Sequence, residues 1–343
     1  MYNSVIIRYG EIGIKGRNRI LFEKQLLNNV REMLFYDKIK FKKIYREQNR
    51  IIIDFEDAKE KNLKNEEFNN QNKNMENEIL KSLDSLKKIF GITSFSPALK
   101  TDLDIENIKR NALLFYNYKN EEIRKEIRKK KRNNKNSTFR VTTQRINKNF
   151  KLNSQEINQE VGAFVVGKTN AKVDLETPEI EIGIEIMKNA YLFLERIKGL
   201  CGLPVFSNDF FLIELKNKNS LLATLYMMKR GLKPIFILKR TKEKIKQLKL
   251  LESIKPFLYG RLDFEFIDKD SNYKEAIVKI LNEKNAVFVS EIIKLNRSNI
   301  KKLEILKKDY GIVLAPLMLM KKEKIHYYKK LLTKTKQQKN KQK

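Results

Sequence analysis

The segment from Leu212 to Pro234 has the spacing of a nucleotide-phosphate site. The apolar run FFLIEL is followed by a short polar turn, and then by a helical pattern of apolar residues that ends at Gly231. Such a unit binds phosphate at the helix N-terminus, where backbone N–H groups and the helix dipole favour negative charge. The turn consists of Leu215, Lys216, Asn217, Lys218, Asn219 and Ser220. Glycine lets successive N–H groups curl around a pyrophosphate, and this turn contains no glycine. The segment therefore has the strand, turn and helix of such a site but lacks the glycines that would let its backbone bind the phosphate.

Residue types that support other chemistry are scarce. The chain has one cysteine, Cys201, and one histidine, His326. A single cysteine excludes a disulfide within the chain, and one cysteine with one histidine argues against zinc and iron–sulfur sites. Catalysis by a cysteine–histidine pair or a serine–histidine–aspartate triad would depend on His326 alone. We therefore expect neither a metal site nor a catalytic triad.

The excess of basic residues indicates a polyanionic partner. Lys and Arg number 73 against 42 Asp and Glu, which gives a formal net charge of +31. Residues 121–151 contain twelve basic and three acidic side chains, and residues 321–343 contain ten lysines and one glutamate. The simplest partner for such a chain is nucleic acid. A general over-use of Lys and Asn, as biased base composition produces, also contributes to the excess.

Length and composition predict a globular protein of two or three domains. The chain has 343 residues, and its apolar fraction of 41% is too high for a disordered protein. No stretch approaches the length of an uncharged apolar membrane span, and the N-terminal MYNSVIIRYGE lacks the apolar core of a signal peptide. We expect a cytoplasmic protein with no membrane partner.

The N-terminal half alternates between strand and helix patterns and predicts an α+β fold. Residues 1–56 indicate a strand, the helix NRILFEKQLLNNVREMLF and two further strands. Residues 56–78 are polar and lack periodicity, which predicts a surface insertion. The elements expected next are the helix ILKSLDSLKKIFG, the strand TSFSPALKT, the helix DIENIKRNALLFYNY, a basic helix, the strand TFRVTTQR, the helix SQEINQEVGAFVV, and the strands KVDL and EIEIGIEIMKNAYLFLERI.

From about residue 205, short apolar strands alternate with helices. The strands are FFLIEL, PIFILK, LDFEFID, AVFVS and IVLAPL. Nearly continuous apolar runs between helices predict a doubly wound parallel sheet whose ligands bind at the C-terminal ends of the strands. The glycines after Gly202 are Gly231, Gly260 and Gly311, and each directly follows a helical pattern and precedes a strand. We expect them to end helices at the opposite edge of the sheet.

Several motifs resemble one family, the tRNA 4-thiouridine synthetases (tRNA sulfurtransferases). RYGEIGIKGRNRILFEKQLLNNV is similar to the start of that family, and TFRVTTQRINKNFKLNSQEINQEVGAFVV and KVDLETPEIEIGIEI are similar to its THUMP domain. KGLCGLPV resembles the linker to the catalytic domain, and MMKRGLKP the end of the first catalytic helix. The resemblance covers nearly the whole chain and is strongest up to Val205. It implies a ferredoxin-like domain at residues 1–78 and a THUMP domain at 79–198. It further implies a pyrophosphatase-loop (PP-loop) ATPase-like domain at 199–333, which has the adenine nucleotide alpha hydrolase-like fold, and a basic tail at 334–343.

The first two domains of this family imply tRNA as the partner, and two groups of residues fit that partner. The first group is a loop in which glycines allow close backbone approach beside basic side chains, namely Gly10, Gly13, Lys15, Gly16, Arg17 and Arg19. The second group lies on or just after a strand and consists of Arg140, Gln144, Arg145 and Lys148. Donors fixed on a strand can grip the phosphates of a folded RNA. We predict that both groups bind RNA.

The catalytic half departs from the family pattern. The family loop Ser-Gly-Gly-x-Asp-Ser falls on residues 215–220, where only Ser220 matches. The family's Thr-Gly-Glu after the fourth strand is replaced by SEIIKLN, residues 290–296, and Cys201 lies in the linker instead of at the position of the active-site cysteine. Lys322 falls on the lysine of the family's Asp-Lys-Glu motif, but Lys321 replaces the preceding acid. We expect a degenerate ATP site, with Lys322 as the one candidate catalytic residue.

Three functions remain open. The first is a tRNA-binding protein that acts in tRNA thiolation and needs no cofactor. Such a protein would present tRNA, or serve as the partner of an intact sulfurtransferase or a sulfur-carrier protein. The second is an active tRNA sulfurtransferase that uses ATP and magnesium at a divergent site, adenylates a uridine carbonyl and takes sulfur from an external donor. The third is a general RNA-binding protein. Each function is compatible with a homodimer.

Overall fold

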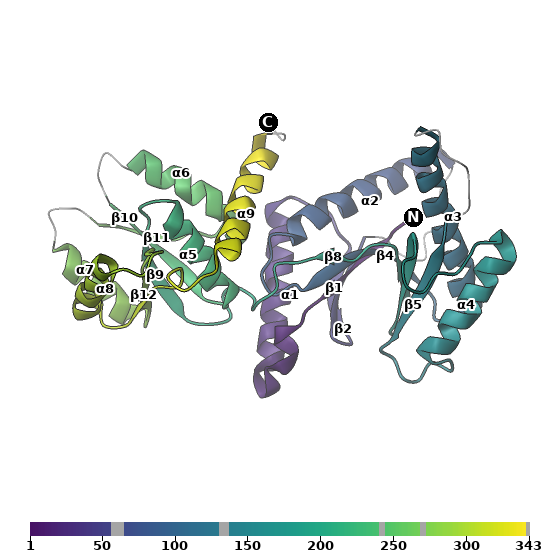
Figure 1. Ribbon diagram of the computed structural model, residues 1–343, viewed down its shortest axis with the longest axis horizontal. Helices are drawn as coiled ribbons and strands as arrows, with labels where there is room; N and C mark the ends of the chain where they lie inside the picture. The colour runs from purple at the N-terminus through teal and green to yellow at the C-terminus, as the bar shows by residue number, and fades with distance from the viewer. Residues whose placement is uncertain (56–64, 130–136, 240–243, 268–271, 341–343) are drawn as a thin grey trace. The chain divides into compact units, whose positions relative to one another are not determined.

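Two compact units interleave along the chain (Figure 1). The structure is a computed structural model that describes residues 1–55, 65–129, 137–239, 244–267 and 272–340. Unit 1 consists of residues 1–9, 38–86 and 93–198, and unit 2 of residues 10–37, 87–92 and 199–343. Each unit combines segments that are far apart along the chain, so this division does not test the four consecutive domain ranges predicted above, which stay a prediction.

Unit 1 contains an eight-stranded sheet that is antiparallel except for one pair, β5 with β6. The strands are β1 (Ser4–Arg8), β2 (Lys43–Glu47), β3 (Arg50–Asp54), β4 (Ser94–Thr101), β5 (Phe139–Arg145), β6 (Ile180–Ile186), β7 (Ala190–Phe193) and β8 (Ile197–Lys198). Their order is β2-β3-β1-β4-β7-β6-β5, and β8 pairs with β4. Gln48 and Asn49, both at positive φ, form the two-residue hairpin turn between β2 and β3.

The sheet of unit 1 curls, so that strands far apart in its order meet across one face. The hydroxyl of Tyr45 on β2 lies 3.3 Å from that of Tyr191 on β7, although β3, β1 and β4 lie between these strands in the sheet. The N–H of Lys188 donates to Oε1 of Glu47 at 2.9 Å. A small apolar core on this face contains Ile6, Ile52, Ala98, Met187, Tyr191 and Phe193. The curl therefore buries part of a sheet face.

Helices α3 (Ile105–Lys129) and α4 (Ser154–Thr169) pack together against strands β5, β6 and β7 of unit 1 (Figure 1). The core between them contains Ile108, Phe115, Tyr116, Phe139, Ile157, Val161, Ile182 and Ile184. At the start of α4, the Asn153 side chain accepts from the N–H groups of Gln155 and Glu156, and Glu156 accepts from the N–H of Asn153. Such a capping box stabilises a helix start by about 1 kcal/mol. The third helix of this unit is α2 (Asn65–Leu86).

Unit 2 contains a five-stranded, fully parallel sheet, which confirms the predicted parallel-sheet fold. The strands are β9 (Phe210–Glu214), β10 (Lys233–Lys239), β11 (Asp263–Ile267), β12 (Val287–Val289) and β13 (Val313–Leu314). Their order is β11-β10-β9-β12-β13. The chain therefore runs outward from β9 to β11 and returns to place β12 on the other side of β9. In open α/β sheets, ligands bind at this switch point, beside the C-terminal ends of the two central strands.

Helices cover both faces of the parallel sheet, as a doubly wound fold requires. They are α5 (Lys218–Lys229), α6 (Lys244–Ile254), α7 (Tyr273–Glu283), α8 (Arg297–Tyr310) and α9 (Lys322–Asn340). Phe211 and Ile213 of β9 share a core with α5, α6 and α9. Leu212, which points to the other face, shares a core with α7 and α8. Gly231 and Gly311 follow α5 and α8 at positive φ, which confirms their predicted role in ending helices.

Helix α1 (Arg19–Tyr36) belongs to unit 2 although it follows the first strand of unit 1. Asn29 Nδ2 donates to the carbonyl of Val205 at 2.9 Å, and Arg261 pairs with Glu32 at 2.7 Å. Near its C-terminal end, α1 places Tyr36 against Gly260, where a Cβ atom would lie 2.8 Å from the ring. The predicted helix of the N-terminal domain thus packs on residues of the C-terminal half.

The structure corrects several predicted elements. Residues 65–78, expected in a surface insertion, are the first turns of α2, and residues 56–64 of that insertion lie outside the described residues. The two helices expected between residues 104 and 129 are the single helix α3. The long strand expected from residue 179 is divided by a turn into β6 and β7, and KVDL makes only an isolated bridge at Val173. Polar or continuous patterns concealed the start of α2 and the turn between β6 and β7, because no Gly or Pro marks either position.

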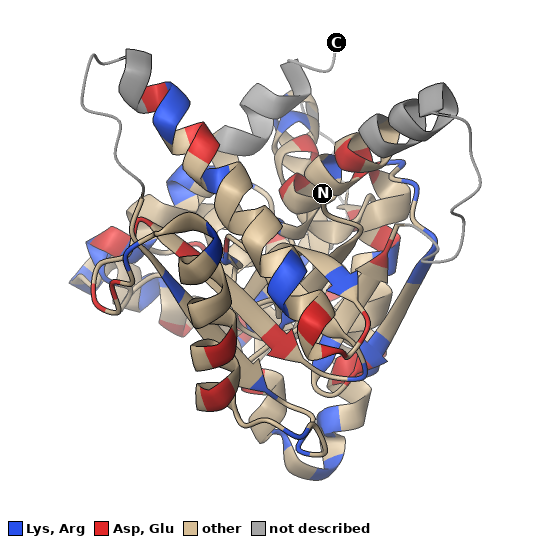
Figure 2. Cartoon of the chain, turned by 90° about the vertical axis from the view of Figure 1, so that its right-hand side faces the viewer, with Lys and Arg blue, Asp and Glu red and all other residues tan. Residues whose placement is uncertain are grey.

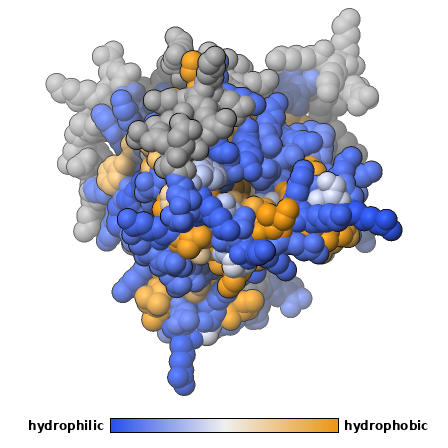
Figure 3. Space-filling model, turned by 90° about the vertical axis from the view of Figure 1, so that its left-hand side faces the viewer, coloured by the Kyte–Doolittle hydropathy of each residue, from blue (hydrophilic) through white to orange (hydrophobic). Residues whose placement is uncertain are grey.

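The face of the molecule shown in Figure 3 is mainly hydrophilic. On the face shown in Figure 3, apolar side chains form small separate groups among hydrophilic ones. Among the described residues, no helix is long and apolar enough to cross a membrane.

Candidate functional sites

One face of the sheet in unit 1 carries the polar side chains of its parallel strands. β5 and β6 are paired in register, with Arg140 beside Glu181 and Gln144 beside Glu185. Because side chains alternate along a strand, these residues share the face opposite to α3 and α4. Thr142 Oγ1 and Arg140 Nη2 both donate to Glu181, at 2.8 and 2.9 Å. We call this face, with Arg140, Thr142, Gln144, Glu181 and Glu185, the polar face.

A cluster of three arginines surrounds one buried carboxylate of the polar face. Glu185 is fully buried and accepts from Nε of Arg8 at 2.5 Å and from Nε of Arg50 at 2.8 Å. Arg196 Nη2 lies 3.6 Å from Glu185 Oε1. Burial by itself raises the pKa of Glu185, but Arg8 and Arg50 outweigh it and hold that pKa below its ordinary value. We call Arg8, Arg50 and Arg196 the arginine cluster.

Phe193 gives two members of the cluster a common platform. The guanidinium carbon of Arg8 lies 4.7 Å from the centre of the Phe193 ring, and that of Arg196 lies 5.7 Å from it. Both distances suit a cation–π contact. The ring occupies the space above Gly183, where a Cβ atom would lie 2.2 Å from Phe193 Cε2. Glycine at this position of β6 therefore makes room for the platform.

The structure separates the four residues predicted near β5. Arg140 and Gln144 lie on the polar face, where Gln144 accepts from Arg50 Nη2 at 3.1 Å. Arg145 points to the opposite face, and its Nη1 donates to the carbonyl of Phe150 at 3.0 Å. Arg145 therefore holds the loop after β5, while Lys148 in that loop is exposed. Whether the four residues bind RNA stays a prediction.

Sequence reasoning missed the arginine cluster because its members are far apart along the chain. Arg8 and Glu185 are separated by 177 positions. The available signal was a charged residue at the end of each of two strongly apolar strands, Arg8 in SVIIR and Glu185 in IEIGIEI. Charges also cover other parts of unit 1, and Figure 2 shows basic and acidic residues interspersed on its helices and strands.

The predicted basic loop near the N-terminus belongs to unit 2, whereas the β5 group belongs to unit 1. It forms two short 3-10 helices, Glu11–Ile14 and Gly16–Asn18. Lys15 Nζ lies 5.2 Å from the ring centre of Phe22, and Arg19 pairs with Glu23 at 2.7 Å. Arg17 is exposed. Of the three predicted basic residues of this loop, Lys15 and Arg19 thus make contacts within unit 2 and Arg17 is exposed, and their binding of RNA stays a prediction.

The turn between β9 and α5 satisfies its own backbone groups. Asn217 Oδ1 accepts from the N–H groups of Asn219 at 2.8 Å and Ser220 at 3.4 Å. Ser220, which is fully buried, accepts at its Oγ from the N–H groups of Lys216 and Asn217, at 3.1 and 3.4 Å. Side chains of the turn therefore accept from four backbone N–H groups around the start of α5, those of Lys216, Asn217, Asn219 and Ser220.

Ion pairs connect the strand ends on both sides of the switch point. Glu214, at the end of β9, pairs with Lys216 at 2.7 Å and with Lys239 of β10 at 2.9 Å. Lys216 also lies 3.7 Å from Glu291, which follows β12. Burial raises the pKa of Glu214, but Lys216 and Lys239 outweigh it and hold that pKa below its ordinary value. We call Glu214, Lys216, Lys239 and Glu291 the switch-point cluster.

Two further residues named from the sequence lie apart from this turn along the chain. Lys322 is exposed at the first position of α9. Cys201 is half-buried at positive φ, and its Sγ lies 4.0 Å from the carbonyl of Gly199. Among the described residues, no group of three or more His, Cys, Asp or Glu side chains could hold a metal ion.

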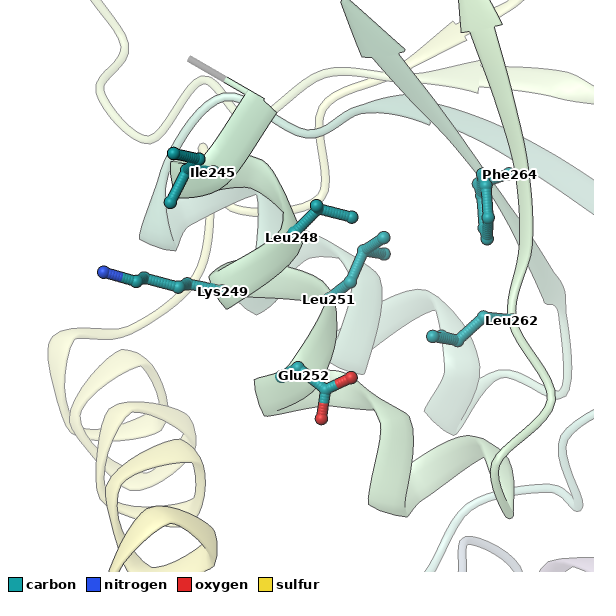
Figure 4. Close-up of a pocket in the computed structure, with 7 residues that line it drawn as sticks. All are labelled: Ile245, Leu248, Lys249, Leu251, Glu252, Leu262 and Phe264. Carbon is teal, nitrogen blue, oxygen red and sulfur yellow. The ribbon is translucent and has the colours of Figure 1, made fainter. Parts of the chain in front are cut away.

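An apolar pocket of about 430 Å³ lies between α6 and the start of β11 (Figure 4). Leu248 and Leu251 of α6 face Leu262 and Phe264. Its remaining lining residues are Ile245, Lys249 and Glu252. Lys249 is the one basic side chain that lines this pocket and Glu252 lies beside it, so the pocket lacks the set of donors that a nucleotide phosphate requires.

Comparisons with protein families match the N-terminal half of the chain. The ThiI ferredoxin-like domain matches residues 4–66, and the THUMP domain matches residues 121–195. A probable tRNA sulfurtransferase of Thermococcus kodakarensis is 33% identical over 287 residues, which are 82% of this chain and 67% of that protein. One of Mycoplasmopsis synoviae is 33% identical over 241 residues, 69% of this chain and 52% of that protein. The chain thus spans about half to two thirds of the length of these relatives.

Two solved structures share the fold over nearly the whole chain. The crystal structure of PH1313 from Pyrococcus horikoshii has a TM-score of 0.76 and 32% identity, and the match covers 96% of this chain and 99% of that one. A 4-thiouridine synthetase, solved as an RNA complex with bound ATP, has a TM-score of 0.66 and 23% identity, and the match covers 97% of this chain and 85% of that one. The predicted combination of ferredoxin-like, THUMP and parallel-sheet domains is confirmed.

Proposed function

The chain belongs to the tRNA sulfurtransferase family, and we propose that it binds tRNA in the thiolation pathway without adenylating uridine itself. The protein would present tRNA to an intact sulfurtransferase or to a sulfur-carrier protein. The two halves of this proposal rest on different parts of the chain.

Binding of tRNA is supported by unit 1 and by charge. Unit 1 contains the residues that match the THUMP domain, 121–195, and the related 4-thiouridine synthetase was solved with RNA. The net charge of +31 favours a polyanion. On the polar face together with the arginine cluster, Arg8, Arg50, Arg140 and Arg196 outnumber Glu181 and Glu185. This face therefore provides fixed donors for RNA.

Loss of adenylation is supported by the turn at residues 215–220. The observation that carries this half is that Asn217 and Ser220 satisfy the N–H groups at the start of α5. A phosphate that used these N–H groups would have to displace these side chains. Lys216, which would supply the positive charge, is already paired with Glu214. The residues present do not fit a bound ATP phosphate.

The alternative is an active tRNA sulfurtransferase with a divergent ATP site. Its support is the retained parallel sheet, with its switch point between β9 and β12, and the serine at position 220. That enzyme would need ATP and magnesium, and an external sulfur donor. A general RNA-binding protein is the second alternative, which the basic composition alone would support.

Two measurements test the proposal. Calorimetric titration of the full chain with ATP and magnesium should show no binding tighter than millimolar. A micromolar dissociation constant that is abolished by Ser220→Ala or Lys322→Ala would contradict the loss of adenylation. In cells, 4-thiouridine in tRNA should fall when the gene is deleted and should return with a Cys201→Ser copy. Unchanged 4-thiouridine after deletion would favour the general RNA-binding protein.

A further inference from the structure

The arginine cluster carries more positive charge than its carboxylate can neutralise. Both oxygens of Glu185 already accept from Nε atoms, Oε1 from Arg8 and Oε2 from Arg50. Arg196, at 3.6 Å from Oε1, is beyond hydrogen-bond distance. Three guanidinium groups thus share one carboxylate, and the cluster keeps a net excess of two positive charges. Excess charge held near a buried site is costly unless an anion neutralises it.

One nitrogen of the cluster is buried and unpartnered. The Arg8 side chain is 6% exposed, and its Nε and Nη1 donate to Glu185 and to Ser96 Oγ, the latter at 3.0 Å. Its Nη2 is buried and has no hydrogen-bond partner. A buried guanidinium N–H without an acceptor is rare in folded proteins. The missing acceptor is consistent with a ligand that supplies oxygen atoms.

Arg196 offers the accessible half of such a site. Its side chain is 52% exposed, and it shares the Phe193 ring with the buried Arg8. One guanidinium is thus fixed by Glu185 and Ser96, and the other is open to solvent on the same platform. The nearby carboxylate of Glu181 is paired with Arg140 at 2.9 Å and also interacts electrostatically with Arg196.

We propose that Arg8 and Arg196, on the ring of Phe193, form a binding site for a phosphate group of the RNA backbone. Arginine suits this ligand because its planar group donates two parallel hydrogen bonds to phosphate oxygens. The phosphate would contact the exposed Arg196 directly and supply the negative charge that the cluster lacks. It would become an acceptor for the buried Arg8 Nη2 only if the side chains around that nitrogen move. The inference rests on the proposed tRNA binding and assigns it to specific atoms.

The test compares Arg196→Ala with Lys198→Ala in the full chain. Both residues are exposed, lie two positions apart and carry one positive charge, so the second variant controls for net charge. Binding of a fluorescently labelled tRNA transcript is measured over a series of salt concentrations. Arg196→Ala should weaken binding about tenfold or more and lower the log–log salt slope by about 1, because one phosphate contact is lost. Lys198→Ala should bind within about threefold of the unaltered chain, since an exposed charge contributes less. Arg196→Lys should fall between them, because it keeps the charge but loses the planar fork.

The outcomes separate this inference from the proposed function. If the unaltered chain binds the transcript, and Arg196→Ala and Lys198→Ala bind it equally, the phosphate site is wrong and tRNA binding stands. If the unaltered chain does not bind the transcript, tRNA binding and the site both fail.

Free phosphate is a separate source of the same group. If inorganic phosphate raises the melting temperature of the unaltered chain but not of Arg196→Ala, while both bind RNA equally, the site belongs to free phosphate and our assignment to RNA is overturned.

Discussion

Asn217 and Ser220 hold each other's backbone N–H groups at the start of α5. Asn217 Oδ1 accepts from the N–H of Ser220, and Ser220 Oγ accepts from the N–H of Asn217, both at 3.4 Å. These two side chains therefore form a reciprocal cap on the N-terminal end of α5. Such a cap raises the free energy of unfolding, and substitutions of its residues can measure by how much.

Asn217→Ala should lower the free energy of unfolding by about 1 kcal/mol, because the N–H groups of Asn219 and Ser220 lose their acceptor. Asn217→Asp keeps that acceptor and adds a negative charge at the helix N-terminus, so we expect a stability within a few tenths of a kcal/mol of the unaltered chain. Urea denaturation followed by circular dichroism measures both. Equal loss in the two variants would show that the cap contributes nothing.

Glu214→Gln should destabilise unit 2 by about 1–3 kcal/mol. The substitution leaves the partly buried Lys216 and Lys239 without the carboxylate to which both are paired. The full cost of breaking a buried ion pair is reduced here because both lysines are partly exposed. Glu283→Gln, which removes an exposed carboxylate from the pair with Lys279 on α7, is the matched control and should change stability by less than about 0.5 kcal/mol. The same denaturation measurement compares the two, and similar small effects would contradict a structural role for the switch-point cluster.

The sequence was most informative where local pattern decides structure. The apolar runs of β9, β10, β11, β12 and β13 predicted the parallel sheet, because strands buried on both faces lack alternation. Gly231 and Gly311 predicted helix ends, because only glycine adopts positive φ freely.

Longer-range structure could not be predicted. The pairing of Arg8 with Glu185 depends on strand order in a curled sheet, and neither residue has a local pattern that identifies the other. The turn between β6 and β7 has no Gly or Pro, and forms with a hydrogen bond from the Met187 N–H to the Asn189 carbonyl. The start of α2 at Asn65 lies in a polar stretch, where helical periodicity cannot be seen.

Gly183→Ala should destabilise unit 1 by about 1–3 kcal/mol or more. The added Cβ atom would lie 2.2 Å from Phe193 Cε2, so the ring and its two arginines would have to move. Gly167→Ala in α4 is the control, since a Cβ atom there meets nothing within 4 Å and alanine favours the helix by about 0.5–1 kcal/mol. The midpoint temperature of thermal unfolding should therefore fall in Gly183→Ala and rise in Gly167→Ala.

A double-mutant cycle tests whether the ring is the cause. In a Phe193→Leu background, Gly183→Ala should cost clearly less, because the smaller side chain leaves room for the new methyl group. If Gly183→Ala lowers the free energy of unfolding equally in both backgrounds, the effect arises from the backbone of β6 and not from the Phe193 ring.

Glu185→Gln should destabilise the chain by about 3–5 kcal/mol at neutral pH, because it leaves the buried Arg8 and Arg50 without their carboxylate. The pKa of Glu185 in the folded chain lies below its ordinary value of 4.5, since Arg8 and Arg50 outweigh the effect of burial. The carboxylate therefore stabilises the folded chain above about pH 4.5, and this contribution is lost as the pH falls through the lowered pKa. Urea denaturation at a series of pH values should show the difference between the unaltered chain and Glu185→Gln at its full size near neutrality and shrinking in acid. Glu283→Gln, at an exposed position, should show a small difference at every pH. A difference for Glu185→Gln that stays constant down to acid pH would show that its effect comes from packing and not from the ionised carboxylate.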